Sequence, residues 1–333
     1  MKAQNNATST LSQARCEHIG REVATAPHIY FASDLDRASE WREAMSTQFE
    51  QFRFSTGEIE DPQTVDVALV WKLPEEGLNR FTGLKAILSL GAGVNQLEPA
   101  RLPPRVPLAR LVDESLTLTM VDYAKAAVYR YHRCFDVFEN AMRHERWQFI
   151  RPKLPHQTSV GILGLGELGR AIAGALQSDG FSVRGWSRSL KQLHGIETYS
   201  GQSGLHALLG GSDIVVNVLP LTDSTRNILR GDLFRHFRRG AKLINIGRGE
   251  HLVEADLLLA LEEGTVGAAT LDVAMEEPLP ASHPFWVHPS ILVTPHVAGL
   301  SLPSSAVLAI AANIRRAMAG EPLHNQVDLG RGY

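Results

Sequence analysis

The chain has 333 residues, of which 44% are apolar and 21% charged, a composition typical of soluble globular proteins with two domains. Its formal charge of -3 gives no general attraction to nucleic acid or to an anionic membrane. Two cysteines, Cys16 and Cys134, exclude a disulfide framework, and the sequence has no CxxC metal pattern. We therefore expect a reducing, cytoplasmic setting and no bound metal.

Residues 1–26 are polar and lack the apolar segment of a secretory signal, so we expect a disordered tail. No apolar run approaches the roughly 18 residues that span a bilayer. The segments that follow comprise several short apolar runs and one amphipathic segment. They predict a helix over 36–46 and strands over 28–33, 66–71, 84–94 and 106–112. This alternation is typical of a mainly parallel sheet covered by helices.

Residues 115–150 carry helical periodicity without a strand, which predicts a long helix. One stripe of that helix holds Tyr123, Ala127, Tyr131 and either Cys134 or Phe135. The stripe fits a core element or a contact between subunits, and the sequence does not choose between them.

A second alternating series begins at "TSVGILGLGELG" (158–169) and continues through five more apolar runs to "ILVTPH" (291–296). Six strands at this spacing predict a doubly wound nucleotide-binding domain. A last helix over 304–319 ends at Gly320, a residue type that commonly closes helices.

The first apolar run of this series leads into Gly164, Gly166 and Gly169, which have the G-x-G-x-x-G spacing. The spacing alone is a weak signal, but here it follows a strand and opens a helix, the context that a dinucleotide site requires. The glycines allow a tight turn and close approach of the backbone to a pyrophosphate, which the helix N-terminus faces. A glycine-rich turn without a ligand is the alternative.

An arginine, two carboxylates and a histidine follow the carboxyl ends of later strands, where ligands bind in open α/β sheets. Arg248 follows "LINIG", Asp272 and Glu277 follow "ATL", and His296 follows "ILVTP". An arginine fork binds a carboxylate and polarises a carbonyl, and a histidine exchanges a proton with the carbonyl oxygen. A carboxylate beside that histidine favours its protonated form. With a nicotinamide cofactor, these groups predict hydride transfer to a 2-oxo acid.

Each of these side chains also has a simpler interpretation. Taken alone, Arg248 fits a phosphate ligand, Glu277 a solvated turn residue and Asp272 a cap of the following turn. His296 alone fits a structural histidine bonded to a nearby carbonyl group. Their joint placement favours the catalytic interpretation.

The turn after the second strand of this domain holds Ser187, Arg188, Ser189 and Lys191, where NAD-binding folds usually carry an acidic residue. No Asp or Glu occurs over 181–195. Two hydroxyls and two cations suit a 2′-phosphate, because arginine makes strong charge-assisted bonds to phosphate. We therefore predict NADPH in preference to NADH, although NADH also fits the fold. An exposed basic turn without a ligand is the alternative.

Beyond its polar tail the chain resembles the D-isomer-specific 2-hydroxyacid dehydrogenases, and within them the glyoxylate/hydroxypyruvate reductase A branch. The resemblance rests on the order and spacing of "ALVWKLP", "ILSLGAGV", "GILGLGELG", "GWSRS", "VLPLTDSTRNIL", "LINIGRGEHLVE", "LDVAMEEPLP", "TPHVAG" and "QVDLGRGY". It implies an α/β fold of two Rossmann-like domains with doubly wound parallel sheets, the cofactor domain being inserted into the substrate domain. The implied substrate domain is 27–112 with 300–333, and the implied dinucleotide-binding domain is 113–299.

The resemblance implies that Arg248, Glu277 and His296 are catalytic, with His296 as proton donor and Glu277 as its partner. The implied substrate pocket is lined by Arg248, Trp71 and an anion nest of Gly91, Ala92 and Gly93. The implied coenzyme site comprises Gly164, Gly166, Glu167, Leu168, Gly169, Trp186, Ser187, Arg188, Ser189, Lys191, Leu219, Pro220, Thr225, Ile246, Gly247, Asp272 and His296.

Two details of that coenzyme site follow from the resemblance. Asp272 would anchor the nicotinamide carboxamide. Gly247 stands where close relatives often carry alanine, and we expect slightly looser packing against the nicotinamide without loss of activity.

The resemblance also implies reduction of glyoxylate and hydroxypyruvate by a homodimer joined through the helix around 115–150. Two alternatives stay open. A dehydrogenase for another 2-hydroxy acid, of the D-lactate or phosphoglycerate type, needs extra cations for a phosphorylated substrate, and Lys72 is the only obvious candidate. A cofactor-gated, non-enzymatic binding module on the same fold needs a peptide groove on the substrate domain, which the sequence does not indicate.

Overall fold

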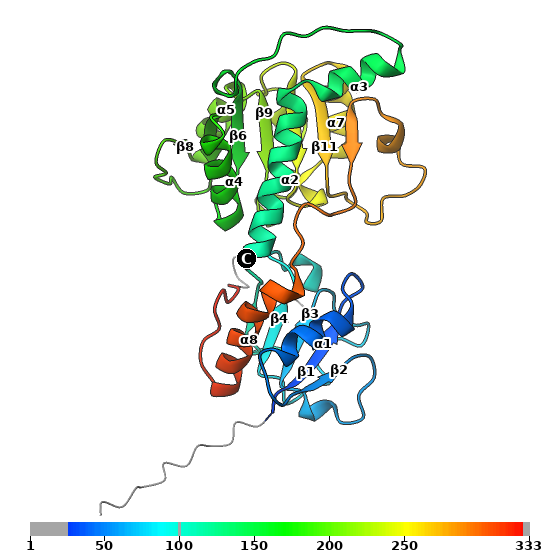
Figure 1. Ribbon diagram of the computed structural model, residues 1–333, viewed down its shortest axis with the longest axis vertical. Coiled ribbons are helices and arrows are strands. Elements are labelled where there is room, and N and C mark those ends of the chain that lie inside the picture. The colour runs from blue at the N-terminus through cyan, green and yellow to red at the C-terminus, as the bar shows by residue number, and fades with distance from the viewer. Residues whose placement is uncertain (1–25, 99–100, 329–333) are drawn as a thin grey trace, which may run out of the picture.

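The structure, a computed structural model, describes residues 26–98 and 101–328. The predicted disordered tail, except for its last residue, and the end of the "QVDLGRGY" motif lie outside these residues. Two parallel β-sheets form two lobes, one above the other in Figure 1. No helix in the described ranges is long and apolar enough to cross a membrane.

The first sheet has the strand order β2-β1-β3-β4-β5, and all its strands are parallel. Helices α1 (Ala38–Ser46) and α8 (Pro303–Ala319) pack on one face, and loops between 73 and 102 cover the other. Because α8 comes from the far end of the chain, both ends of the sequence build this lobe (Figure 1). Its strands are β1 (His28–Ala32), β2 (Arg53–Ser55), β3 (Val67–Val70), β4 (Ala86–Ser89) and β5 (Leu108–Ala109).

The second sheet has the order β12-β11-β10-β9-β6-β7-β8, again all parallel. Its strands are β6 (Ser159–Leu163), β7 (Ser182–Trp186), β8 (Glu197–Tyr199), β9 (Ile214–Asn217), β10 (Ala241–Asn245), β11 (Val266–Leu271) and β12 (Ile291–Val293). One core lies between this sheet and helices α2 (Glu114–His132) and α4 (Glu167–Ser178). The other lies against α5 (Gly201–Gly210), α6 (Gly231–Phe234) and α7 (Glu254–Glu262).

Each predicted strand is present, because strands buried on both faces read as continuous apolar runs, but those expected over 84–94 and 106–112 are shorter, Ala86–Ser89 and Leu108–Ala109. All four residues of β3, β4 and β9 are buried, for example. The sequence analysis missed β2 and β8. Each has only three residues, lies at a sheet edge and is partly exposed, so neither makes an apolar run.

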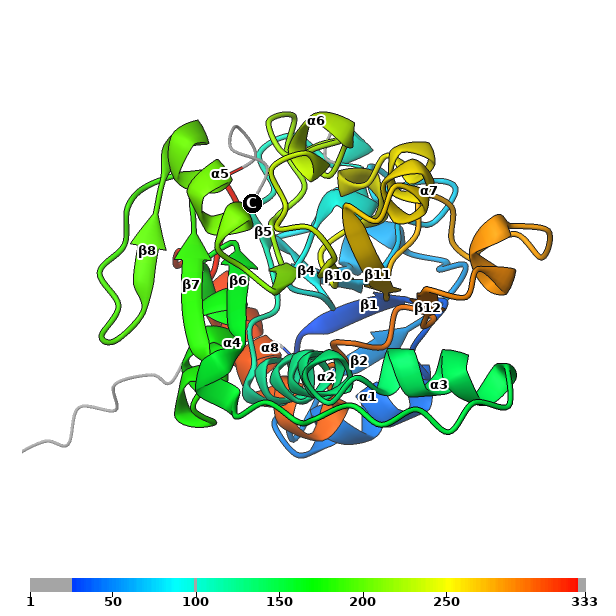
Figure 2. The ribbon, with the colours of Figure 1, turned by 90° about the horizontal axis from the view of Figure 1, so that it is seen from above.

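The single long helix expected over 115–150 is wrong. The side chain of Asp113 caps α2 by accepting from the N–H groups of Ser115 and Leu116, and α2 ends at His132. Cys134 then takes a φ of 59°, which interrupts the helix, and α3 begins at Phe135 and ends at Arg143. Residues 144–154 form no helix and return from the end of α3 toward β6, passing α2 on the side away from the sheet (Figures 1 and 2).

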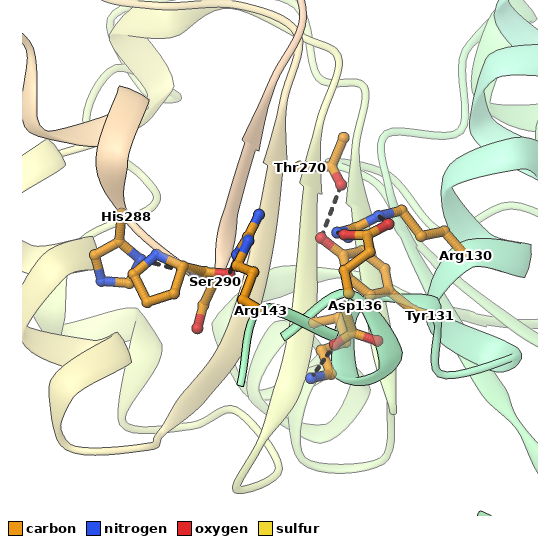
Figure 3. A network of polar contacts seen from close by, with 10 residues as sticks. Arg130, Tyr131, Asp136, Arg143, Thr270, His288 and Ser290 are labelled. Carbon is orange, nitrogen blue, oxygen red and sulfur yellow. Dashed lines mark hydrogen bonds and ion pairs between the residues drawn. The ribbon is translucent and has the colours of Figure 1, made fainter. Parts of the chain in front are cut away.

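Polar contacts fix the junction of α2 and α3 onto the second sheet (Figure 3). The hydroxyl of Tyr131 lies 2.7 Å from that of Thr270 on β11, and Lys242 Nζ on β10 lies 2.8 Å from Asp136 Oδ2. Arg143 donates to the Pro289 carbonyl at 3.4 Å, beside β12. The predicted stripe therefore lies partly in the core, with Tyr131 buried, and partly at the surface, with Phe135 exposed.

The strand orders locate the ligand site. In the second sheet the strand order reverses between β6 and β9, although all the strands are parallel. The first sheet follows the doubly wound order 2-1-3-4-5. In such sheets ligands bind at the carboxyl ends of the strands, near the reversal. The loops after β3, β4, β6, β7, β9 and β10 all border one cleft.

Candidate active site

The cleft between the two lobes has a volume of about 1,180 Å³. Most small-molecule sites have about 300–1,000 Å³, so the cleft has room for a dinucleotide together with a small substrate. Every residue predicted for the coenzyme or the substrate lines it. Of the three predicted catalytic residues, Arg248 and His296 line the cleft, and Glu277 lies behind His296.

The glycine loop has the geometry that a dinucleotide requires. Gly164 takes a φ of +104°, which side chains rarely allow, and a Cβ atom on Gly169 would lie 1.8 Å from the Gly164 carbonyl oxygen. Gly166 caps the N-terminus of α4, and a Cβ atom there would meet no protein atom within 4 Å. Backbone conformation therefore explains Gly164, and packing explains Gly169. The third leaves open the space in front of the helix N-terminus, which suits a pyrophosphate.

The basic turn follows β7 directly. Ser187 is buried and donates to the Ser189 carbonyl at 2.8 Å, which closes the turn. Trp186 donates from its ring to the Gly201 carbonyl at 2.9 Å and so ties the turn to the start of α5. Arg188 and Lys191 are exposed on the rim of the cleft.

The substrate loop, residues 91–93, follows β4 on the other side of the cleft. A Cβ atom on Gly91 would lie 2.5 Å from the ring of Trp71, and one on Gly93 would lie 1.8 Å from Arg248 Nη2. The Trp71 ring therefore restricts position 91, whereas a side chain at position 93 would displace the end of the Arg248 side chain from its place beside the loop. The N–H groups of Ala92 and Gly93 donate to no atom of the described chain, so they remain available to an anion.

Arg248 lies in the turn after β10, and its guanidinium group packs against Gly93 across the cleft. Its Nη1 donates to the Gly247 carbonyl at 2.8 Å. Burial lowers the pKa of Arg248, against the opposing effect of the Glu250 and Glu277 charges. A guanidinium group nevertheless keeps its charge at neutral pH.

His296 lies just past β12 in the left-handed region, with a φ of 55°. Its Nδ1 lies 2.7 Å from Glu277 Oε2, which leaves Nε2 on the cleft side of the ring. Glu277 Oε1 accepts from the Ala274 N–H at 3.0 Å. Burial opposes ionisation of this carboxyl group, but the bonds from His296 and Ala274 outweigh burial and lower the pKa of Glu277. An ionised carboxylate therefore lies beside the ring at neutral pH.

Trp71 and Asp272 frame His296 from two sides. The rings of Trp71 and His296 meet edge to face, with their centroids 6.1 Å apart. Asp272 is buried and accepts from the N–H groups of Val297 at 2.9 Å and Ala298 at 2.8 Å. Burial raises the pKa of Asp272, although these bonds act in the opposite direction. The carboxylate thus holds the loop that carries His296, and its contact with the coenzyme stays a prediction.

Two neighbours of this loop were missed by the sequence analysis. Thr294 donates to Asp272 Oδ1 at 2.6 Å, and Tyr123 on α2 lies 2.6 Å from the Thr294 hydroxyl. The sequence placed Tyr123 on a helical stripe and gave no signal that its hydroxyl reaches a loop 171 residues later.

The cations near the substrate loop also differ from the expectation. Lys72 is exposed, pairs with Asp34 at 3.8 Å and does not line the cleft. Arg110, directly after β5, does line it, and within the described ranges it has no ion-pair partner. Arg110 follows the short strand β5, and the sequence gave no reason to select it.

A dinucleotide loop and a histidine–carboxylate pair that share one cleft are typical of a nicotinamide-dependent oxidoreductase of the α/β class. Residues 126–298 match the family model described as "D-isomer specific 2-hydroxyacid dehydrogenase, NAD binding domain". The glyoxylate/hydroxypyruvate reductase A of Serratia proteamaculans is 42% identical over 312 residues, which cover 92% of this chain and 100% of that protein. The chain belongs to the D-isomer-specific 2-hydroxyacid dehydrogenase family, and the resemblance to its reductase A branch is confirmed.

Solved structures agree. A D-isomer-specific 2-hydroxyacid dehydrogenase from Xanthobacter autotrophicus, crystallised with NADPH and MES, is 40% identical with a TM-score of 0.87. An NADPH-dependent glyoxylate/hydroxypyruvate reductase from Sinorhizobium meliloti, crystallised with NADP and sulfate, is 35% identical with a TM-score of 0.85. Each match covers 92% of this chain and 100% of the other. The fold class and the NAD-binding domain predicted from the sequence are therefore confirmed.

Proposed function

We propose that this protein reduces small 2-oxo acids, with glyoxylate and hydroxypyruvate as its substrates and NADPH as its preferred coenzyme. The observation that carries the proposal is the convergence of Arg248, the substrate loop and the His296–Glu277 pair on one cleft. The names of the relatives support the substrate class.

Arg248 and the substrate loop bind the 2-oxo acid. The N–H groups of Ala92 and Gly93 donate to the substrate carboxylate as an anion nest, and the guanidinium fork lies directly beside them. A planar fork in that position bonds the carboxylate and polarises the neighbouring carbonyl group. The close approach of the guanidinium group to Gly93 lets the two groups contact one substrate carboxylate.

His296 supplies the proton. A reduced nicotinamide bound in the cleft would supply the hydride to the carbonyl carbon. His296 Nε2 gives its proton to the carbonyl oxygen, and the product is a 2-hydroxy acid. Glu277 holds Nδ1, which fixes the ring orientation and favours the protonated imidazole.

The basic turn sets the coenzyme preference. Arg188 is the largest contributor to binding of the 2′-phosphate, with Ser187, Ser189 and Lys191 as secondary groups. A lost charged hydrogen bond costs about 1.5–3 kcal/mol, so Arg188→Ala is expected to weaken NADPH roughly tenfold or more. NADH affinity hardly changes. Fluorescence titration with each coenzyme checks this, and equal KM values for both in the unmutated protein contradict it.

The decisive test of the reaction is a panel of 2-oxo acids with each reduced nicotinamide and purified protein. We expect NADPH oxidation with glyoxylate and hydroxypyruvate. The panel includes a phosphorylated and a dicarboxylic 2-oxo acid, because Arg110 lines the cleft and suits a second anionic group. Turnover of those acids alone favours a dehydrogenase for another substrate, and NADPH binding without turnover of any acid favours a binding module.

We further propose the domain division 27–112 with 300–333 and 113–299, and a homodimer formed through α2, α3 and residues 144–154. Large apolar side chains are exposed on α3 and the following segment, among them Met142, Trp147 and Phe149. Such patches commonly mark protein interfaces. A second copy of the chain is the expected occupant, and the mass in solution by light scattering tests it. A monomeric mass at micromolar concentration contradicts the dimer.

A further inference from the structure

Behind Arg248 lies a buried group of polar side chains that the mechanism above does not use. This amide–histidine cluster comprises Asn217, Asn245 and His251, each 0% exposed. The two asparagines are the last residues of β9 and β10, and His251 ends the short 3-10 turn Gly249–His251. Buried polar groups are costly unless they are hydrogen-bonded, so the bonds within the cluster decide what it does.

The bonds assign one tautomer to His251. Its Nδ1 accepts from the Arg248 N–H at 3.1 Å and from Asn217 Nδ2 at 3.0 Å. A nitrogen that accepts twice carries no proton, so the proton is on Nε2. Nε2 donates to the Pro220 carbonyl at 3.3 Å.

The asparagines complete the hold on the Arg248 turn. Asn245 donates from Nδ2 to the Arg248 carbonyl at 3.2 Å, and its Oδ1 accepts from Asn217 at 2.9 Å. The same Oδ1 accepts from the Gly247 N–H at 3.2 Å. Both backbone polar groups of Arg248 are therefore bonded to the cluster.

We propose that His251 is a positioning residue that joins the two halves of the ligand site. Its Nδ1 fixes the turn that directs Arg248 at the substrate loop, and its Nε2 fixes the Pro220 loop that lines the coenzyme side of the cleft. The inference rests on the proposed role of Arg248 in substrate binding.

The cluster keeps this arrangement at neutral pH. Burial lowers the pKa of His251 to about 4, the bond to Pro220 opposes that shift, and the Arg248 and Arg226 charges add to it. His251 is therefore neutral at neutral pH, and Nδ1 remains an acceptor. A protonated His251 would lose that acceptor and place a second cation beside Arg248.

Two substitutions separate the two ring nitrogens. In His251→Asn, the amide oxygen takes the place of Nδ1 and the contact with Pro220 is lost. In His251→Gln, the longer amide reaches toward Pro220 and the acceptor for Arg248 is lost. His132→Asn and His132→Gln are matched controls, because His132 is also buried and bonds a hydroxyl, that of Thr158, at 2.9 Å.

The measurements are the KM and kcat for glyoxylate, the Kd for NADPH by fluorescence titration, and the Tm. We expect His251→Gln to raise the glyoxylate KM about five- to tenfold with nearly unchanged NADPH affinity, because a buried N–H loses its partner. We expect His251→Asn to weaken NADPH several-fold with a nearly unchanged glyoxylate KM. The His132 variants lower the Tm and leave both constants unchanged.

The inference is overturned if the His251 variants behave like the His132 variants, with a lower Tm and unchanged ligand constants. Where a His251 variant fails to fold, Asn217→Ser keeps the imidazole and removes one donor to Nδ1, and it must raise the glyoxylate KM in the same direction by a smaller factor. If the wild type does not reduce glyoxylate, or Arg248→Lys is fully active, the proposed function fails and the inference falls with it. A failure confined to His251 leaves those two results intact, so the two failures are distinguishable.

Discussion

Two histidines serve the cleft: His296 lines it and His251 lies buried behind Arg248, and their surroundings are opposite in character. The side chain of His296 is 27% exposed and lies 2.7 Å from the Glu277 carboxylate. His251 is fully buried and bonds only amide and carbonyl groups. Charged, partly hydrated support allows a ring to gain and lose a proton, whereas dry and neutral support holds one tautomer.

The proton that His296 exchanges and the constant charge of Arg248 are thus kept in different surroundings within one fold. Both histidines follow strand ends of the same sheet, so their positions in the topology do not distinguish them. Acidic side chains bond the loop that carries His296, whereas amide and imidazole groups bond the turn that carries Arg248. A charge behind Arg248 that changed with pH would alter substrate binding, and the neutral amide–histidine cluster adds no such charge.

The largest effect is expected from removing the imidazole of His296, which impairs proton transfer. His296→Ala removes the donor, so kcat for glyoxylate should fall about 10²–10⁴-fold. NADPH affinity should change little. Steady-state kinetics at neutral pH measure the loss, and near-normal turnover would remove His296 from the mechanism.

A smaller loss of activity is expected from a change at Arg248. Arg248→Lys keeps the charge but not the planar fork, so kcat/KM for glyoxylate should fall roughly 10- to 100-fold, the loss of about one charged hydrogen bond. Arg42→Lys on α1, exposed and away from the cleft, is the matched control. Wild-type affinity and rate in Arg248→Lys would show that the fork is not used.

The smallest effect concerns stability against acid. Burial lowers the pKa of His251 to about 4 in the folded protein from its ordinary value of 6.5, so only the unfolded chain binds its proton between these pH values. Stability therefore falls as the pH drops from 6.5 toward 4, by at most about 3 kcal/mol from this group. Urea unfolding of the wild type and His251→Asn over this window checks it. An equal loss in both proteins would contradict a neutral, buried His251.

Much of the fold and of the site was predictable from the sequence, for physical reasons. Strands buried on both faces give unbroken apolar runs, and glycines in a strand–turn–helix context indicate a dinucleotide loop. Arg248 and His296 were found because each directly follows such a run.

What was missed depends on contacts between distant segments. Nothing local shows that Tyr123 reaches Thr294 or that Arg110 borders the cleft. The break at Cys134 depends on one backbone angle. The amide–histidine cluster left one signal, an asparagine at the end of each of two buried strands, but its partner His251 is fixed only by the fold.

The proton of His296 responds to the Glu277 carboxylate, whereas the charge of Arg248 is positioned by neutral groups. The pH dependence of kcat/KM for glyoxylate in the wild type, Glu277→Gln and His251→Asn tests this contrast most directly. We expect the alkaline fall in rate to move to lower pH in Glu277→Gln, because the imidazolium loses its partner, and to stay at the wild-type position in His251→Asn. A Glu277→Gln profile that coincides with the wild type, or a His251→Asn profile that moves with that of Glu277→Gln, would contradict the contrast.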